Sequence, residues 1–156
     1  MIVDEVTMPE YERGLARSRT VLIPFGSLEE HGAHLPLCTD TLQVAEVCRR
    51  VAERTGAHVA PAVAYGVCRS TRNHPGTVGV TTATLRAMAV DLVRDFHRHG
   101  MRSFVLISGH AGKTHVLTLV DAGEQLLDEL PDIRISVISE YHEIQEAGKA
   151  IVEAED

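Results

Sequence analysis

The sequence predicts a single α/β domain over residues 1–156, built on a mostly parallel sheet with helices covering both faces. Two patterns predict this class. Short apolar runs, typical of buried strands, alternate with longer segments in which apolar residues recur every three or four positions, as in amphipathic helices. These helical segments are about 12–18 residues long, which is enough to connect parallel strands. The length also suits one domain, because domains most often have about 100–150 residues.

Five short segments have the composition of strands. The clearest are TVLIPF, which precedes Gly26, and SFVLIS, which precedes Gly109. Both are apolar nearly throughout, as expected of strands that are buried on both faces of a parallel sheet. The predicted strands are residues 20–25, 58–63, 77–80, 103–108 and 133–139.

Four segments have helical periodicity. In residues 82–99 one apolar stripe runs along the helix, Thr81 or Thr82 can cap its start, and Gly100 stands where a helix commonly ends. The stripe consists of Leu85, Met88, Ala89, Leu92, Val93 and Phe96. The predicted helices are residues 41–54, residues 82–99, a segment after the loop 109–114 that ends near Glu129, and a last segment marked by Ile144, Ala147, Ile151 and Ala154.

Charge and composition disfavour several classes of function. The chain has 15 basic and 22 acidic residues and a net charge of −7. This balance disfavours binding to nucleic acids and anionic membranes, which need a basic surface. No stretch approaches the roughly 18 apolar residues of a membrane span, and the N-terminus lacks the apolar core of a signal peptide. The three cysteines form no CxxC pair, which is typical of a reduced protein. We therefore expect a cytoplasmic protein with no nucleic-acid or membrane partner.

The loop after the first predicted strand, residues 26–40, concentrates carboxylate and imidazole groups. Its ionisable side chains are Glu29, Glu30, His31, His34 and Asp40. Carboxylates and imidazoles together suit Zn²⁺, Mn²⁺ or Fe²⁺, whereas Mg²⁺ and Ca²⁺ prefer oxygen alone. Glu29 and His31 are two positions apart, so in an extended segment their side chains share one side.

A second loop, SGHAGKT at residues 108–114, follows another buried strand and contains His110. In open α/β sheets ligands bind outside the carboxyl ends of the strands, so both loops are expected at the functional edge. If the two strands are neighbours, their loops bring Glu29, His31, Asp40 and His110 to one point. These four residues are the candidate metal ligands.

Each of these residues, taken alone, also has a purely structural interpretation. Asp40 is favoured at a helix start by the helix dipole. Glu29 and Glu30 could lie in a solvated loop, and His34 could be a hydrogen-bonded core residue.

Three other features leave alternatives open. The tripeptide GKT at residues 112–114 resembles the end of a phosphate-binding loop, although Ile107 stands where that motif requires glycine. Cys38 could be a nucleophile or a small buried residue. The segment 65–77 could line a pocket for an anionic or carbonyl group, or it could be a solvated loop. Its candidate pocket residues are Arg69, Arg72, Asn73 and His74.

The motifs resemble those of the creatininase (creatinine amidohydrolase) family over most of the chain. The resemblance is carried by IPFGSLEEHGAHLPLCTD at residues 23–40, by HPGT at residues 74–77 and by ISGHAGK at residues 107–113. It implies an α/β fold with a divalent metal centre, usually of two ions, and commonly a hexameric assembly. Members include creatinine hydrolases, a deformylase of a nucleotide-like precursor and a peptidase that matures a peptide-derived redox cofactor.

Carried over by motif position, the resemblance implies that Glu29 and His31 are metal ligands. It further implies that Asp40 bridges two ions and that His110 is another ligand. One position departs from the pattern. Creatinine-hydrolysing members have a metal-binding glutamate two residues after the histidine of the second motif, where this chain has Gly112.

The ligand missing at that position could be replaced by Glu140 or Glu143, supplied by another subunit, or lost by truncation. Other members have a later His-Ala-Gly segment, and a nearby glutamate is expected to complete their site. We therefore expect residues 1–156 to be one creatininase-like domain that lacks the C-terminal part of the family. The absence of tryptophan disfavours creatinine as the substrate, because members that hydrolyse it use aromatic residues around it.

The resemblance and the candidate ligands together predict a metal-dependent amidohydrolase that cleaves a C–N bond of an amide, cyclic amide or formamide. We expect a small-molecule substrate and up to two ions, Zn or Mn with Fe as a further option. Glu30 or His34 is the candidate acid that protonates the leaving nitrogen. We also expect a homo-oligomer, with a hexamer as the implied size. The alternative is a non-catalytic or inactive truncated protein that acts through binding or assembly.

Overall fold

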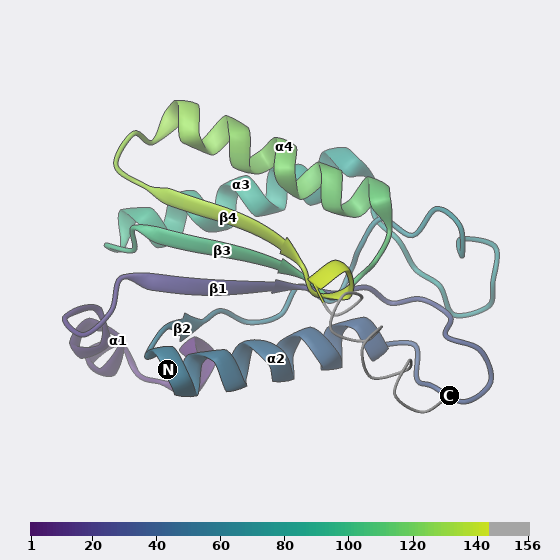
Figure 1. The fold of residues 1–156 in the computed structure, drawn as a ribbon, viewed down its shortest axis with the longest axis horizontal. Helices are drawn as coiled ribbons and strands as arrows, with labels where there is room; N and C mark the ends of the chain where they lie inside the picture. The colour runs from purple at the N-terminus through teal and green to yellow at the C-terminus, as the bar shows by residue number, and fades with distance from the viewer. Residues whose placement is uncertain (144–156) are drawn as a thin grey trace.

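Figure 1 shows the computed structural model, which describes residues 1–143. Its strands form one four-stranded sheet in the order β2-β1-β3-β4, and every pairing is parallel. The elements are a 3-10 helix η1 (Val3–Glu5), α1 (Met8–Leu15), β1 (Thr20–Phe25), α2 (Thr39–Thr55), β2 (His58–Val59), α3 (Thr82–Arg98), β3 (Ser103–Ser108), α4 (Lys113–Glu129) and β4 (Arg134–Ser139). The predicted α/β class and parallel sheet are confirmed.

The three long strands are aligned with one another. β1 pairs with β3 from Thr20 opposite Ser103 to Phe25 opposite Ser108, and β3 pairs with β4 up to Ser108 opposite Ser139. The carboxyl ends of the three strands therefore lie at one edge of the sheet, as their arrowheads show in Figure 1. This alignment decides which loops meet.

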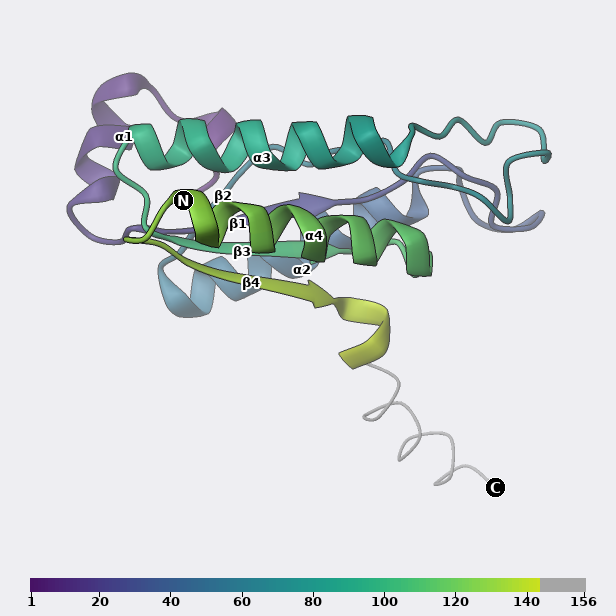
Figure 2. The ribbon, with the colours of Figure 1, turned by 90° about the horizontal axis from the view of Figure 1, so that it is seen from above.

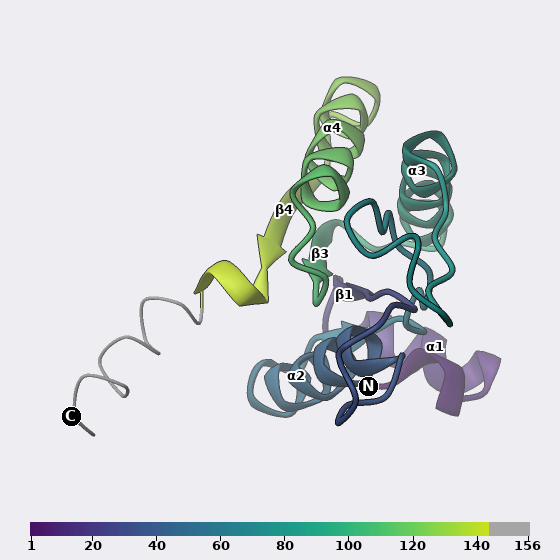
Figure 3. The same cartoon turned by 90° about the vertical axis from the view of Figure 1, so that its right-hand side faces the viewer.

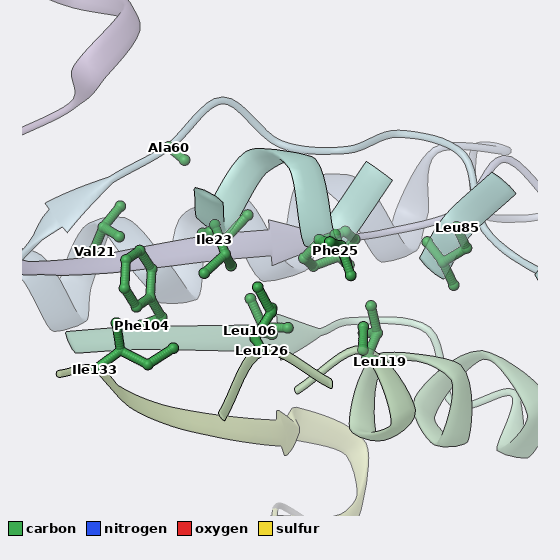
Figure 4. Close-up of a cluster of buried hydrophobic side chains, with 14 of the residues drawn as sticks. Val21, Ile23, Phe25, Ala60, Leu85, Phe104, Leu106, Leu119, Leu126 and Ile133 are labelled. Carbon is green, nitrogen blue, oxygen red and sulfur yellow. The ribbon is translucent and has the colours of Figure 1, made fainter. Parts of the chain in front are cut away.

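Helices cover both faces of the sheet, as Figures 2 and 3 show from two directions. On one face, Ile23 and Leu106 belong to a core that also includes buried side chains of α3 and α4 (Figure 4). On the other face, Leu22 packs in a second core with Val44 and Cys48 of α2. Because successive residues of a strand point to opposite faces, a strand between two helical layers is apolar throughout. The all-apolar segments that predicted β1 and β3 are explained by this sandwich.

One predicted strand, residues 77–80, does not form. The Val78 N–H donates to Leu28 O at 2.9 Å, and the Val80 N–H donates to Gly66 O at 2.9 Å. These amides therefore bond to two separate loop segments rather than to one neighbouring strand. Val80 packs against the core without extending the sheet, and Val78 is exposed.

The predicted strand at residues 58–63 is shorter than expected. Only His58–Val59 is a strand, and Val63 then makes a single isolated bridge with Phe25. Pro61 has no amide hydrogen to donate, so it interrupts the ladder after the first residues.

The helix boundaries are close to the prediction. α2 begins at Thr39, two residues before the predicted start. α3 ends at Arg98, and the Thr81 side chain caps its start by accepting the N–H of Thr84 at 3.1 Å. The periodicity did not predict α1.

The predicted last helix, marked by Ile144, Ala147, Ile151 and Ala154, lies outside the described residues. Within residues 1–143, none of the helices has both the length and the apolar composition needed to cross a membrane.

Candidate metal centre

The loops that leave β1 and β3 meet the first turn of α2 at the carboxyl edge of the sheet. The Gly109 N–H donates to Phe25 O at 2.9 Å, which joins the starts of the two loops. A Cβ atom at Gly109 would overlap the backbone oxygen of Asp40, so the close approach of this loop to α2 requires glycine. Backbone contacts thus bring together two loops that are distant in the sequence.

The structure brings together all four candidate metal ligands. The Nδ1 atom of His110 is 2.8 Å from Glu29 Oε1 and 2.9 Å from Asp40 Oδ2. The Nε2 atom of His31 is 2.9 Å from the other oxygen of Asp40. Glu29, Asp40 and His110 are buried, with exposed fractions of 7%, 6% and 5%, and His31 is half-buried. Asp40 is therefore the centre of the cluster, with one oxygen facing each imidazole.

Two hydroxyl groups orient the carboxylates. The Ser27 O–H donates to Asp40 Oδ2 at 2.7 Å, and the Thr71 O–H donates to Glu29 Oε2 at 2.5 Å. Ser27 lies at the start of the ligand loop, and Thr71 lies in the segment 65–77. Thr71 bonds Oε2 of Glu29 and leaves Oε1 to His110, whereas Ser27 bonds the same Asp40 oxygen that faces His110 and leaves Oδ1 to His31.

Backbone carbonyls orient the two imidazoles. The Nδ1 atom of His31 lies 3.1 Å from Glu29 O, and the Nε2 atom of His110 lies 3.3 Å from Val67 O. A carbonyl oxygen only accepts hydrogen bonds, so each ring donates its N–H to the carbonyl. The other nitrogen of each ring then faces the carboxylates and can bind a cation, the orientation typical of metal-bound histidine.

The cluster favours positive charge. Burial opposes a charge on His110, but its hydrogen bonds with Asp40 and Glu29 outweigh burial and raise its pKa to about 9. Burial also opposes the charges of Glu29 and Asp40, but hydrogen bonds with His110 help to hold the pKa of both carboxyls below the usual value. Burial opposes the charge of His31 as well, yet its contacts with Glu29 O and Asp40 raise its pKa. Two ionised carboxylates therefore face two imidazoles in a largely buried site.

The donor atoms fit a divalent transition metal. One ligand atom from each of Glu29, His31 and Asp40 lies within 4.8 Å of the others, and the same holds for Glu29, Cys68 and His110. Imidazole, carboxylate and thiol donors suit zinc and its neighbours in the first transition series. The imidazolium of His110 already places positive charge between two carboxylates, as a bound cation would.

A cavity of about 460 Å³ opens on these side chains. All four candidate ligands line it, and its other walls include Leu35, Gln43 and Tyr141. The volume suits a small molecule, and the wall combines apolar and hydrogen-bonding groups.

The two candidate proton donors lie outside the lining of this cavity. Glu30 Oε2 accepts the N–H of Gly32 at 3.0 Å within its own loop, and His34 is exposed. Glu30 stands between Glu29 and His31, whose side chains face the cavity, and alternate side chains of an extended segment point in opposite directions.

None of the other candidate residues lines this cavity. Arg69 and Arg72 line a different cavity of about 600 Å³. Asn73 and His74 are exposed in a turn. Cys38 is half-buried immediately before α2 and does not line the cavity beside the candidate ligands.

Cys68 is a residue of the site that the sequence patterns did not identify. It is buried, and its Sγ atom lies 3.7 Å from Gly66 O. Burial and the nearby Glu29 carboxylate raise the pKa of its thiol to about 11. The only indication in the sequence is that Cys68 lies in the segment 65–77, which could line a pocket for an anionic or carbonyl group.

Comparison with known proteins decides the family. A family model described as "Creatininase: Creatinine amidohydrolase" matches residues 4–155. The chain belongs to the creatininase family. The resemblance seen in the sequence motifs is thereby confirmed.

Three relatives within the creatininase family have different named activities. The chain is 42% identical to creatinine amidohydrolase of Pseudomonas putida over 116 residues, which are 70% of this chain and 45% of that protein. It is 42% identical to mycofactocin precursor peptide peptidase of Mycolicibacterium smegmatis over 103 residues, or 62% of this chain and 41% of that protein. It is 31% identical to 3-dehydro-scyllo-inosose hydrolase of Thermotoga maritima over 147 residues, which are 92% of this chain and 46% of that protein. The chain thus spans less than half the length of each relative.

Solved creatininase structures share the fold. A crystal structure of creatinine amidohydrolase (creatininase) has a TM-score of 0.82 and 36% identity, and the match covers 88% of this chain and 57% of that chain. A mutant creatininase described as the Zn-Zn type has a TM-score of 0.83 and 34% identity, and the match covers 90% of this chain and 58% of that chain. A structure described as creatininase Mn has a TM-score of 0.81 and 36% identity, and the match covers 88% of this chain and 57% of that chain.

Gly112 stands where the motif resemblance implies a glutamate in creatinine-hydrolysing members. A Cβ atom at Gly112 would overlap Nε2 of His110 and lie 3.0 Å and 3.1 Å from two carbon atoms of the same ring. The histidine ring thus occupies the space that a side chain would need. With the ring in this position, a side chain at position 112 would require the ring to move.

Glu140 and Glu143 were the expected substitutes for that glutamate. Glu143 is exposed. Glu140 is buried, and neither of its carboxylate oxygens has a hydrogen-bond partner among the described residues. Burial and the charge of Asp40 raise the pKa of Glu140 to about 7. Within residues 1–143, however, Glu140 belongs to neither group of close donor atoms.

His115 helps to orient His110, because the peptide group of Val67 contacts both imidazole rings. His115 is completely buried, and its ring meets the ring of His110 edge-on with the centroids 5.0 Å apart. The Val67 N–H donates to Nδ1 of His115 at 3.1 Å, while the Val67 carbonyl faces Nε2 of His110. Burial, followed by the charge of His110, lowers the pKa of His115 to about 4.

Lowering the pH is therefore expected to destabilise the metal-free protein through His115. Its folded pKa of about 4 lies below the ordinary value of 6.5, so its contribution is complete above pH 6.5 and is lost as the pH falls toward 4. The loss is about 3 kcal/mol, because each pKa unit corresponds to roughly 1.4 kcal/mol. His110 acts in the opposite direction, because its raised pKa of about 9 keeps it protonated in the folded state while the unfolded chain takes up this proton near pH 6.5; its contribution is complete a little below that pH.

Denaturant unfolding of the wild type and His115→Asn, each in chelator between pH 7 and pH 4, measures this effect. Asparagine can still accept the Val67 N–H but has no proton to gain. We expect the wild type to lose about 3 kcal/mol more than the variant over this range. Equal losses in the two proteins would contradict the assignment.

Proposed function

We propose that the chain is a metal-dependent amidohydrolase that cleaves a C–N bond of an amide, cyclic amide or formamide in a small molecule. The observation that carries this proposal is the convergence of two imidazoles and two carboxylates beside a cavity of about 460 Å³. The names of two relatives in the family, an amidohydrolase and a peptide peptidase, support C–N bond hydrolysis.

The donor set supports a site for up to two ions. Asp40 has one oxygen 2.9 Å from His31 and the other 2.9 Å from His110, an arrangement that suits a carboxylate shared by neighbouring ions. The creatininase structures described as Zn-Zn type and as Mn support zinc or manganese. The same donors also suit Fe²⁺.

The reaction requires activation because an amide carbonyl is a poor electrophile and nitrogen is a poor leaving group. When bound, divalent ions supply Lewis-acid chemistry, since they acidify water and polarise a carbonyl oxygen. Glu29 and Asp40 contribute fixed negative charge, held in position by the hydroxyls of Thr71 and Ser27. Leu35 and Tyr141 narrow the cavity in which the substrate is held.

The proton for the leaving nitrogen is proposed to come from Glu30 or His34. Both lie on the loop that carries Glu29 and His31, although neither lines the cavity. The donor would be the residue whose replacement, Glu30→Gln or His34→Ala, lowers kcat by about 10²-fold or more while the metal content is unchanged. If neither variant does so, the proton comes from elsewhere, and Tyr141 is the next residue to replace.

Gly112 favours one alternative, a non-catalytic member that acts through binding or assembly. The ring of His110 fills the space next to Gly112, so the glutamate of creatinine-hydrolysing members has no counterpart there. Such a protein would bind fewer than two ions per chain, or it would bind two ions without hydrolysing a substrate. Homo-oligomerisation, with a hexamer as the implied size, stays a prediction under both proposals.

Metal analysis and a substrate panel test the proposal. The full chain is loaded with Zn²⁺ or Mn²⁺, its ion content is measured, and hydrolysis of a cyclic amide, a linear amide, a formamide and a short peptide is followed. We expect two ions per chain and hydrolysis of at least one non-peptide compound, abolished by a chelator and restored by metal. Two bound ions without hydrolysis would support the non-catalytic alternative, and cleavage of the peptide alone would overturn the proposed substrate class.

A further inference from the structure

We propose that Cys68 is a ligand of the metal centre and supplies a thiolate where Gly112 leaves the site without a glutamate. The inference rests on the proposed metal-dependent function and names a ligand that the motif pattern does not contain. It assigns one ion a donor set of carboxylate, imidazole and thiolate.

The geometry of three buried side chains carries this inference. The Sγ atom of Cys68, a carboxylate oxygen of Glu29 and a ring nitrogen of His110 all lie within 4.8 Å of one another. All three residues are buried, with 7%, 7% and 5% exposed. Around a tetrahedral zinc ion, with Zn–S of about 2.3 Å and Zn–N of about 2.0 Å, sulfur and nitrogen ligands lie about 3.5 Å apart. The side chains therefore need only small movements to share one ion.

The two groups of close donor atoms share a single residue. One group is Glu29, His31 and Asp40, and the other is Glu29, Cys68 and His110. Each group offers three donors for one ion, and Asp40 lies beside both groups, with one oxygen facing His31 and the other facing His110. Cys68 thus supplies the third donor of the second group, at a site where Gly112 offers none.

The backbone that orients His110 also fixes the position of Cys68. The peptide group of Val67 donates its N–H to His115, and its carbonyl faces Nε2 of His110. Cys68 is the next residue, and it packs against Gly79, where a Cβ atom would lie 3.3 Å from the Cys68 nitrogen. The thiol is therefore held beside His110 by the same rigid segment.

Binding of the ion replaces one bond of the thiol by another. The S–H bond breaks, the proton leaves to solvent, and the sulfur lone pair forms the bond to the metal, with no change of oxidation state. A soft thiolate favours Zn²⁺ or Co²⁺ over Mn²⁺. The ion held by Glu29, Cys68 and His110 is therefore expected to be zinc rather than manganese. The group of Glu29, His31 and Asp40 has only oxygen and nitrogen donors and accepts zinc or manganese.

Cobalt binding tests the inference with a signal that does not depend on activity. The full chain, freed of metal by chelation, is titrated with Co²⁺, and cobalt content and absorption are measured together. We expect a thiolate-to-cobalt charge-transfer band in the near ultraviolet for the wild type. In Cys68→Ser this band should be absent and Co²⁺ should bind at least about tenfold more weakly, because even the loss of an outer-shell partner costs about 10–100-fold in affinity.

Cys38→Ser is the matched control. Cys38 and Cys48 belong to neither group of close donor atoms in the described part of the chain, and Cys38 is half-buried at the N-terminal end of α2. Cys38→Ser should keep the band at full intensity. A cobalt-loaded wild type without the band, or a band that persists in Cys68→Ser, would overturn the role of Cys68 and leave the proposed metal-dependent function standing.

Zinc-edge X-ray absorption of the wild type adds a measurement that needs no variant to fold. A sulfur atom in the zinc coordination shell is expected, and a shell of nitrogen and oxygen alone would overturn the inference. A wild type that binds neither Co²⁺ nor Zn²⁺ would overturn both the thiolate ligand and the proposed function.

Discussion

Asp40→Ala is expected to abolish binding of at least one ion and to lower the rate of the proposed hydrolysis by about 10³-fold or more. Asp40 faces His31 with one oxygen and His110 with the other, so its removal affects both parts of the site at once. Lewis-acid stabilisation contributes several kcal/mol, and about 1.4 kcal/mol corresponds to a factor of ten in rate. Metal content by elemental analysis and kcat/KM on the substrate of the wild type measure the two effects.

Asp91→Ala is the control for this experiment. Asp91 is exposed on α3, and among residues 1–143 it pairs only with Arg94 at 3.6 Å, an interaction that is worth little at the surface. The control should keep both ions and full activity. If Asp40→Ala also kept both ions, Asp40 would have no place among the ligands and the proposed centre would have to be abandoned.

Gly112→Ala is expected to be as damaging as the loss of a ligand, although only a methyl group is added. The new Cβ would overlap Nε2 of His110, so the ring would have to move away from Glu29 and Asp40. The backbone at Gly112 has an ordinary negative φ of −59°, so the effect comes from contact with the ring and not from backbone strain. A displacement of about 1 Å at a reacting centre can cost about 10²-fold in rate, and we expect at least that loss in kcat/KM.

Gly123→Ala provides the matched substitution on the same helix. A Cβ atom there would lie 3.5 Å to 4.0 Å from Val137 and Ile135, which is ordinary van der Waals contact. Alanine favours a helix over glycine by about 1 kcal/mol, so this variant should be at least as stable as the wild type and bind both ions. Full metal binding by Gly112→Ala would show that the ring of His110 can reposition freely, contrary to the close packing around it.

Local patterns were sufficient to predict much of the fold. β1, β3 and α3 follow directly from apolar runs and from a helical stripe, because burial on two faces or on one face leaves a periodic trace in the sequence. The pattern failed at residues 77–80, where a short apolar segment bonds to Leu28 and Gly66 and has no neighbouring strand. A strand exists only with a partner, and no local pattern specifies one. The local pattern also predicted too long a strand at residues 58–63, where Pro61 interrupts the hydrogen-bond ladder after Val59.

Four of the candidate ligands were also predictable. Glu29, His31, Asp40 and His110 stand in two motifs at the ends of two strongly apolar strands, and parallel strands in register must place such ends at one edge. The sequence alone therefore determined which edge carries the chemistry and which acids and imidazoles meet there.

Only the tertiary structure decided what surrounds those four residues. Cys68 and Thr71 come from a segment with no metal-binding pattern, and His115 stands in the first turn of α4; contacts between these segments bring them to the site. The space beside Gly112 and the hydrogen-bond environment of Glu140 are likewise properties of packing. Local periodicity records which face of an element is buried, whereas contacts between distant segments depend on the shape of the whole fold. For this reason the acids and imidazoles could be read from the sequence, and the thiol beside them could not.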